Sequence, residues 1–341
     1  MGTARFGSSR LLPPPSRWRT FTSISLGLCR ISLLALIAVH SASAQQFNEV
    51  HVGPRTSFLP SVADRPLRAN VDLVLVNVTV LDHQDRAVTG LTPANFAVVD
   101  DKGAQTIKYL SNVDEPISVV VVLDASASMA AKFQEEQKAL TEFIRASNPQ
   151  DEFSLIVVHD TLQVASHVDA LTDENPRVAD AIQADGNTAL WDGMYLGIHE
   201  LKNSRYQRRA MLVVSDGGDN HSRYTQAELK SLLKESDIQV YALGLFNPYA
   251  NRIEEKMGPL ELDEVTSVTG GRVLSVHNSV EISQAVMQIS QELRSEYVLG
   301  YYPTNRTRDG RWRKLQIKVV GTPDHTKLRL YARKGYYAAA Q

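Results

Sequence analysis

The chain carries three kinds of hydrophobic pattern. In VDLVLVNVTVL, residues 71–81, valines alternate with polar residues, which is typical of a strand with one buried face. In ISVVVVL, residues 117–123, the apolar residues are continuous, as in a central parallel strand covered on both faces. Elsewhere, for example at 132–147 and 190–201, apolar residues recur every three or four positions and predict amphipathic helices.

Predicted strands and helices alternate from about Pro116 to Leu293. Besides 117–123, strands are expected at 153–159, 210–215, 238–245 and 272–276, with 161–165 turning back as a hairpin. Helices are expected at 132–147, from Pro176 onward, at 190–201, after a capping box formed by Thr225 and Glu228, at 261–269 and around 282–293. This alternation predicts an α/β fold with a doubly wound, mostly parallel sheet.

Short strands are expected on both sides of this middle region, at 94–101 and 106–110 before it and at 295–304, 312–320 and 327–332 after it. We expect the N- and C-terminal strands to pair in a small flanking β-sandwich. The predicted organisation is a signal peptide at 1–44, a linker or extended arm at 45–69, N-terminal strands at 70–112, an α/β domain at 113–295 and C-terminal strands at 296–341.

The first 44 residues have the composition of a secretory signal. They contain five arginines and no acid, then the apolar run ISLLALIAV, then an A-x-A cleavage signature at Ala42-Ser43-Ala44. The apolar run is too short to span a bilayer, so we expect a periplasmic, outer-surface or released protein without a stable membrane span; retention of the leader as an anchor is the alternative. Cys29, the only cysteine, lies inside the leader, which leaves the mature chain without a disulfide.

Charge argues against nucleic acid as a partner. The chain has 36 basic and 38 acidic residues, and removing a leader with five arginines leaves a net charge of about −7. No G-x-x-x-x-G-K-S/T loop is present, so no nucleotide is expected. In the chain after the leader, basic residues gather between Arg306 and Lys334, where we interpret them as outward-facing positions of solvated strands.

Oxygen-bearing side chains follow or precede the predicted elements at three places. DASAS after the first buried strand supplies Asp124, Ser126 and Ser128, DGNTA before the 190–201 helix supplies Thr188, and SDGGDN after the 210–215 strand supplies Asp216. In doubly wound sheets such loops meet at the carboxyl ends of the strands. Hydroxyls and carboxylates without sulfur or imidazole favour one hard cation, Mg²⁺, Ca²⁺ or Mn²⁺. Two carboxylates among five candidates leave a coordination position for an Asp or Glu carboxylate of a protein partner.

The motifs DASAS, GNTALWDG and SDGGDN, in this order, resemble the metal-ion-dependent adhesion site of von Willebrand factor type A domains. More narrowly, residues 70–337 resemble the von Willebrand factor A-related proteins of acidobacteria, which have strands before the domain and stretches similar to YVLGYYPT and WRKLQIKV after it. The resemblance implies that Ser126 and Ser128 bind the ion directly and that Thr188 and Asp216 bind it directly or through water, with Asp124 as a buried anchoring carboxylate. Ala127 departs from the family pattern, because glycine is common there, and is expected to stiffen or slightly distort the first loop.

Other side chains leave alternatives open. Asp219 is either a supporting residue behind the site or an exposed loop carboxylate, and His159 and His221 are either general bases beside a metal or ordinary loop and cap residues. The function that the sequence favours is a secreted or periplasmic, metal-dependent, protein-binding module without catalysis. The alternatives are an extracytoplasmic metal-dependent hydrolase, for which no convincing pair of nucleophile and base is found, and a structural subunit of an envelope complex with a vestigial site.

Overall fold

The computed structural model describes residues 73–112, 114–159, 163–168, 185–247, 249, 252–322 and 327–340. The expected leader, the expected arm and the helix expected from Pro176 lie outside the described residues. None of the helices in the described ranges has the length and hydrophobicity of a membrane-spanning segment.

A six-stranded sheet with the order β10-β9-β8-β5-β6-β7 forms the middle of the chain. Its first five strands are parallel, and β7 runs antiparallel to β6, as the expected hairpin requires. The strands are β5 (Ser118–Asp124), β6 (Glu152–Val158), β7 (Gln163–Val168), β8 (Arg209–Ser215), β9 (Ile238–Gly244) and β10 (Val273–Ser275). All seven residues of β5 are buried, which confirms that its continuous apolar run belongs to a strand covered on both faces.

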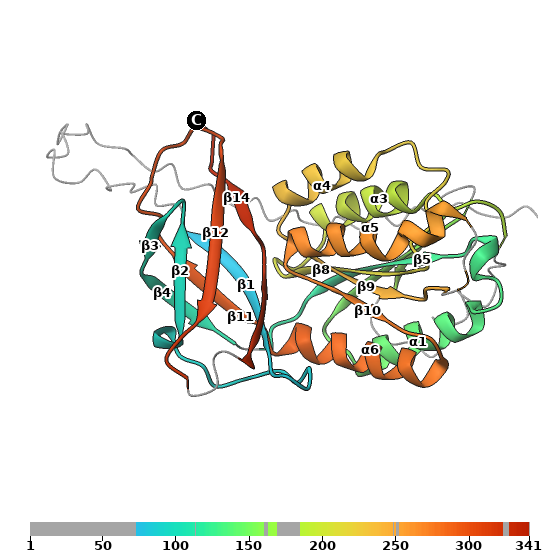
Figure 1. Ribbon diagram of the computed structural model, residues 1–341, viewed down its shortest axis with the longest axis horizontal. Coiled ribbons are helices and arrows are strands. Elements are labelled where there is room, and N and C mark those ends of the chain that lie inside the picture. Colours follow the sequence, from blue (N-terminus) through green and yellow to red (C-terminus); the bar gives the residue numbers. More distant parts are fainter. Residues whose placement is uncertain are drawn as a thin grey trace, which may run out of the picture. The chain divides into compact units, whose positions relative to one another are not determined.

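Helices cover both faces of this sheet (Figure 1). They are α1 (Phe133–Ala146) and α6 (Ser279–Arg294) on one face, and α3 (Leu190–Lys202), α4 (Gln226–Glu235) and α5 (Ile253–Thr269) on the other. The sheet has a hydrophobic core on each face, and alternate residues of β5 point into one or the other. Val121 packs with α1 and α6, and Val122 packs with α3, α4 and α5. The predicted capping box is confirmed, because Thr225 Oγ1 accepts a hydrogen bond from the Glu228 amide at 3.2 Å.

Two antiparallel sheets, β13-β1-β11-β4 and β14-β12-β2-β3, enclose a third core. Strands from the two ends of the chain pair as expected: β1 lies between β11 and β13, and β2 pairs with β12. The six-stranded sheet is therefore inserted in the sequence between β4 and β11 of this sandwich. The strands are β1 (Val74–Leu81), β2 (Phe96–Asp100), β3 (Gly103–Gln105), β4 (Ile107–Ser111), β11 (Tyr297–Tyr301), β12 (Trp312–Val319), β13 (Arg329–Ala332) and β14 (Gly335–Tyr337).

The helix expected at 261–269 begins earlier than the sequence suggests. It starts at Ile253 and contains Pro259. The Gly258-Pro259 pair resembles a helix boundary, because proline lacks the amide of an interior turn. The helix tolerates the proline and ends as expected at Gly270, whose φ of 88° provides a left-handed C-cap.

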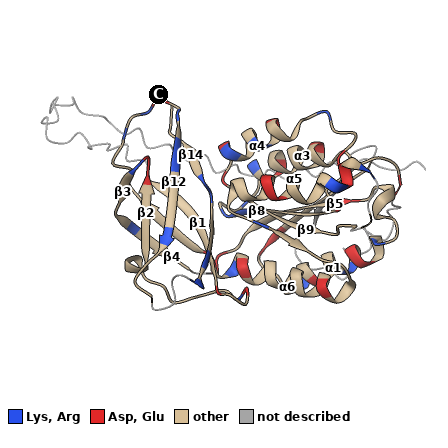
Figure 2. Cartoon of the chain, viewed as in Figure 1, with Lys and Arg blue, Asp and Glu red and all other residues tan. Residues whose placement is uncertain are grey.

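Basic residues of the C-terminal strands are of two kinds. Lys314 and Lys318 are exposed on β12, as expected of outward-facing strand positions, and the basic stretch of β12 is visible in Figure 2. Arg313 on the same strand is buried and forms an ion pair with Asp309 at 2.8 Å. At least one basic residue of this region is therefore buried in an ion pair and does not contribute to a basic surface.

Candidate metal site at the edge of the parallel sheet

The first of the three loops turns back on itself directly after β5. Asp124, the last residue of the strand, accepts a 3.0 Å hydrogen bond from the Ser126 amide on Oδ1. A short 3-10 helix, Ala127–Met129, follows and brings the Ser126 and Ser128 hydroxyls to 3.1 Å from each other. Ser126 is buried and Ser128 is exposed, so the two hydroxyls lie at the boundary between the interior and the solvent.

Asp124 is held from a second strand. Its Oδ2 accepts a 2.6 Å hydrogen bond from the hydroxyl of Ser215, the last residue of β8, which in turn accepts from the Gly217 amide. The pKa of Asp124 is raised to about 7, mainly by burial and in part by the charge of Asp216, while the hydrogen bonds from Ser215 and Ser126 oppose the shift. Ionised Asp124 therefore lacks sufficient compensating positive charge in its surroundings.

The second loop is joined to the first through the backbone. The Asp185 amide donates to the Ala125 carbonyl at 2.9 Å, and the Ala127 amide donates to the Gly186 carbonyl at 3.2 Å. Gly186 has a φ of 79°, a conformation that glycine adopts without strain. Ala127 is absent from the residues with positive φ, so its backbone does not need the glycine that is common at this position in the family it resembles.

Hydrogen bonds of Asn220 and Asp219 join the second and third loops. The Asn220 side chain accepts from the Thr188 amide at 3.0 Å, and the Asn220 amide donates back to the Thr188 carbonyl. Oδ1 of Asp219 accepts from the Leu190 amide at 2.8 Å, which caps the start of α3. Asp219 is half-buried and hydrogen-bonded, so of the two alternatives for this residue the exposed loop carboxylate is wrong.

A close approach of two glycines fixes the third loop against α5. Gly217 has a φ of 80°, and a Cβ placed on it would lie 2.6 Å from the Cα of Gly258. A Cβ on Gly258 would in turn lie 2.4 Å from the Asp216 carbonyl oxygen. These neighbours are backbone atoms and cannot rotate away, so both positions exclude a side chain. The contact determines where Asp216 lies.

A pocket of about 280 Å³, which includes open solvent, lies where the loops meet. It is lined by Ser126, Ser128, Gly186, Thr188, Gly218 and Asn220 from the three loops and by Arg252, Glu254 and Glu255 at the start of α5. Three of the five predicted ligands therefore share one pocket. The other two, Asp124 and Asp216, are adjacent through bonded neighbours, because Asp124 binds Ser126 and Asp216 Oδ1 accepts from the Gly218 amide at 3.1 Å.

The two candidate histidines do not line this pocket. His221 donates its backbone amide to the Thr188 carbonyl at 3.0 Å, which is a structural contact in the loop. His159 directly follows β6. Neither position supports the hypothesis of a general base next to a metal.

Sequence reasoning overlooked three polar residues around the site: Ser215, Asn220 and Glu136. Ser215 ends an apolar strand immediately before Asp216, and that position could have marked it. Asn220 is in the quoted SDGGDN motif but was not assigned a contact, because pairing with a distant loop is not visible in one sequence. Glu136 interrupts the apolar face of α1 formed by Phe133, Leu140 and Phe143, a pattern that the sequence does contain.

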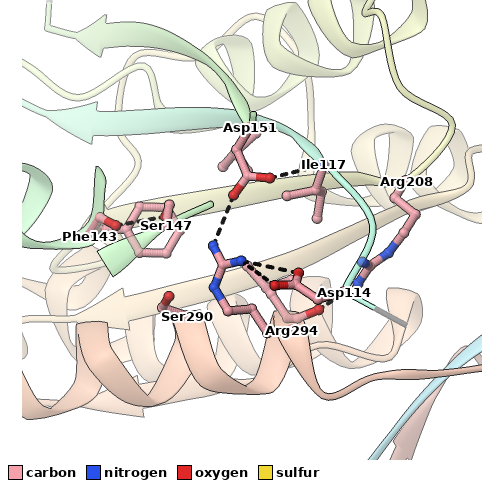
Figure 3. A pocket seen from close by; sticks show the side chains of 10 residues that line it. Asp114, Ile117, Phe143, Ser147, Asp151, Arg208, Ser290 and Arg294 are labelled. Carbon is pink, nitrogen blue, oxygen red and sulfur yellow. Dashed lines mark hydrogen bonds and ion pairs between the residues drawn. The ribbon is translucent and has the colours of Figure 1, made fainter. Parts of the chain in front are cut away.

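A second pocket lies at the amino ends of the strands and has a different composition (Figure 3). Arg294 reaches up from α6 and binds Asp114 at 2.8 Å and Asp151 at 3.1 Å. Asp151 also accepts from the Ile117 amide, so this cluster attaches the segment entering β5 to the base of the sheet. Its acids are already paired with an arginine and are poor candidates for a cation.

Comparisons with known proteins find one family match and several similar proteins. Residues 119–218 match the family described as von Willebrand factor type A domain. A protein of Borreliella burgdorferi, named only as uncharacterized, is 24% identical over 208 residues, which cover 54% of this chain and 61% of the relative. The chain thus spans about three fifths of the length of this curated relative.

Two bacterial proteins are among the solved structures that match part of this chain. The conserved hypothetical protein BatB from Bacteroides thetaiotaomicron is 19% identical, with a TM-score of 0.42, and the match covers 52% of this chain and 100% of that one. A von Willebrand factor type A protein from Catenulispora acidiphila is 12% identical, with a TM-score of 0.45, and the match covers 80% of this chain and 75% of that one.

Proposed function

We propose that this protein, a member of the von Willebrand factor type A family through residues 119–218, is a metal-dependent protein-binding module that acts outside the cytoplasm and has no catalytic activity. A divalent cation at the carboxyl edge of the parallel sheet completes its coordination with an Asp or Glu carboxylate of the partner. The observation that carries the proposal is the convergence of three loops, distant in sequence, on the pocket lined by Ser126, Ser128 and Thr188.

The chemistry of the converging groups fits a hard cation. Three hydroxyls and two carboxylates suit Mg²⁺, Ca²⁺ or Mn²⁺ better than zinc or copper. Ser126, Ser128, Thr188 and Asp216 would hold the ion directly or through water, and Asp124 would fix the Ser126 turn. Among the described residues, no three His, Cys, Asp or Glu side chains gather closely enough to hold a metal by themselves, so the hydroxyls are essential to the proposed site.

A bound ion would supply positive charge at the mouth of a pocket that opens to solvent. Two carboxylates do not complete the coordination of such an ion, which leaves a position for an external oxygen. Large apolar side chains are exposed beside the pocket, on the loop before α5 and along the helix: Tyr249, Ile253, Met257 and Leu260. In α5 these positions are spaced four and three residues apart, so they lie on one face and favour a protein surface as the partner.

Location outside the cytoplasm rests on the sequence of the first 44 residues. Their arginines, apolar run and A-x-A signature support export through the secretory pathway. Fractionation of cells that produce the full chain tests this part of the proposal. Recovery of the chain from the cytoplasm with its first residues intact would contradict it.

The proposed binding activity can be tested by affinity capture. The immobilised chain is incubated with an envelope extract in Mg²⁺ and eluted with EDTA, in parallel with Asp216→Asn and Glu235→Gln. We expect a protein that elutes with chelator from the wild type and from Glu235→Gln, because Glu235 is exposed at the end of α4 and does not line the pocket. Asp216→Asn should capture none. Equal capture by all three chains, or capture indifferent to EDTA, would contradict a metal-bridged contact.

The same chains discriminate binding from catalysis. Purified wild type should not hydrolyse model ester, phosphate or peptide substrates in Mg²⁺ or Mn²⁺ above the rate of Asp124→Asn. Turnover by the wild type that is lost in Asp124→Asn would favour a metal-dependent hydrolase.

A further inference from the structure

Glu136 occupies a position of α1 that is otherwise apolar. It follows Phe133 by three residues and precedes Leu140 by four, and all three side chains are buried on the face that packs against the sheet. Glu136 itself is 0% exposed. An ionisable side chain at such a position is rare unless it is paired.

Both carboxylate oxygens of Glu136 lack a hydrogen-bond partner among the described residues. A buried, unpaired carboxylate destabilises the folded state, whereas a leucine here would extend the core. A nearby positive charge would reduce this cost.

The surroundings of Glu136 are electrostatically unbalanced. Burial raises its pKa well above the usual range, the charge of Asp124 raises it further, and that of Asp216 adds to the effect. Lys132 opposes these effects but does not form an ion pair with Glu136; its ammonium group donates to the Leu245 carbonyl. Glu135, on the same turn, also raises the pKa slightly.

Hydrogen bonds connect this turn of α1 to the site. The Glu136 amide donates to the Lys132 carbonyl at 3.1 Å, and the Lys132 ammonium group is bound to the carbonyl of Leu245. The Leu245 amide donates at 3.0 Å to the carbonyl of Ser215, whose hydroxyl binds Asp124.

A divalent cation would correct this imbalance. A divalent ion would add two positive charges near Asp124 and Asp216, whose negative charges raise the pKa of Glu136, and would therefore lower the cost of keeping Glu136 ionised. Because the interior screens charge far less than water does, a carboxylate behind the ligands still acts on the ion.

We propose that Glu136 is a positioning residue for the cation: its buried carboxylate does not coordinate the ion but strengthens ion binding through the interior of the domain. This inference rests on the proposed function, because it takes the cation site as given. It differs from the roles of the five ligand candidates, since Glu136 lies on α1 and does not line the pocket. Its effect is on cation affinity, which can be measured without any partner.

The experiment is a calorimetric titration of the purified full chain with Mn²⁺ at pH 7.5. Glu136→Gln keeps the size of the side chain and removes its charge, Glu136→Asp keeps the charge, and Glu135→Gln removes a neighbouring charge as a control. We expect Glu136→Gln to raise the Kd for Mn²⁺ about tenfold or more, the equivalent of about 1.4 kcal/mol. Glu136→Asp should retain most of the affinity, and Glu135→Gln should change it less than threefold, as an order of magnitude.

Thermal unfolding separates this role from a purely structural one. We expect Glu136→Gln to unfold at a higher temperature than the wild type in EDTA and to gain less from Mn²⁺. A variant that shifts the unfolding temperature equally with and without Mn²⁺, or binds Mn²⁺ as tightly as the wild type, would overturn the inference and leave the proposed function standing. Failure of the wild type to bind Mn²⁺ would contradict both. Glu136→Met replaces Glu136→Gln if the latter does not fold.

Discussion

The hydroxyl of Ser215 donates a 2.6 Å hydrogen bond to Oδ2 of Asp124, 91 residues earlier in the chain. The bond joins the carboxyl ends of β5 and β8, which are neighbouring parallel strands. The Ser215 hydroxyl also accepts a hydrogen bond from the Gly217 amide. One hydroxyl therefore holds both the Asp124 carboxylate and the turn that follows Asp216. Ser215, which is not one of the five candidate ligands, thus connects two of the three loops.

Replacing Ser215 should disturb both connections. We expect Ser215→Ala to lower the free energy of unfolding by about 2 kcal/mol, because a buried carboxylate loses a donor, and to weaken Mn²⁺ binding. Ser290→Ala is the matched control, since Ser290 is also buried and bonds the Ala146 carbonyl far from the site. Urea denaturation and Mn²⁺ titration of both variants provide the measurement. Equal loss of Mn²⁺ affinity in the two variants would show that the Ser215 contact has no special role.

The contact between Gly217 and Gly258 predicts a second effect. Gly258→Ala would place a Cβ 2.4 Å from the Asp216 carbonyl oxygen, so the third loop must move. We expect a loss of about 1–3 kcal/mol in the free energy of unfolding together with reduced Mn²⁺ affinity. Leu260→Ala, at a position of α5 that is 53% exposed, is the control and should change neither quantity appreciably. A stable Gly258→Ala with normal affinity would contradict the close approach.

The buried carboxyl of Asp124 predicts how stability depends on pH. Its pKa is about 7 in the folded chain and near 3.8 when exposed, so the folded chain binds more protons between these values. The free energy of unfolding in EDTA should therefore fall as pH rises from about 4 to about 7, by the order of 4 kcal/mol for this group. Urea denaturation at pH 5 and pH 7.5 measures the change, and Asp124→Asn should flatten it. A metal-free protein whose stability rises over this range, or an unaltered slope in Asp124→Asn, would contradict the prediction.

The apolar side chains on α5 predict a second part of the partner contact. Ile253 is 74% and Leu260 53% exposed, and replacing both with serine should weaken binding of the chelator-eluted partner about tenfold without changing Mn²⁺ affinity. Val280→Ser, on α6 at the opposite face of the sheet, is the control, because Val280 is 65% exposed. Surface plasmon resonance with the captured partner makes the comparison. Equal affinities would place the partner away from α5.

Much of the fold could be predicted from the sequence because its signals are local. The uninterrupted valines of β5 indicate burial on both faces, and Thr225 with Glu228 marks the start of α4 through contacts within one turn. The order of the three loops follows from the same alternation, since parallel strands place their carboxyl ends at one edge. These features determined the candidate ligands Asp124, Ser126, Ser128, Thr188 and Asp216, whose binding of a metal stays a prediction.

The remaining features depend on contacts between distant residues. The start of α5 was misplaced because Gly258-Pro259 looks like a boundary locally, whereas Gly258 serves the packing against Gly217. Asn220 and Ser215 act on loops 32 and 91 residues away, which no local pattern encodes. Glu136 shows the opposite situation: its interruption of an apolar face is visible in the sequence, but its meaning depends on the charges that the fold gathers around it.

We propose that three loops hold one divalent cation and leave a coordination position for a partner's carboxylate. An anomalous difference map from crystals of the wild-type chain grown in Mn²⁺ would locate the ion. We expect a single strong peak within coordination distance of the Ser126 and Ser128 hydroxyls, with an outward-facing ligand that is water or a carboxylate from another molecule. No peak in the pocket, or a peak bound only by residues other than the five candidates, would contradict it.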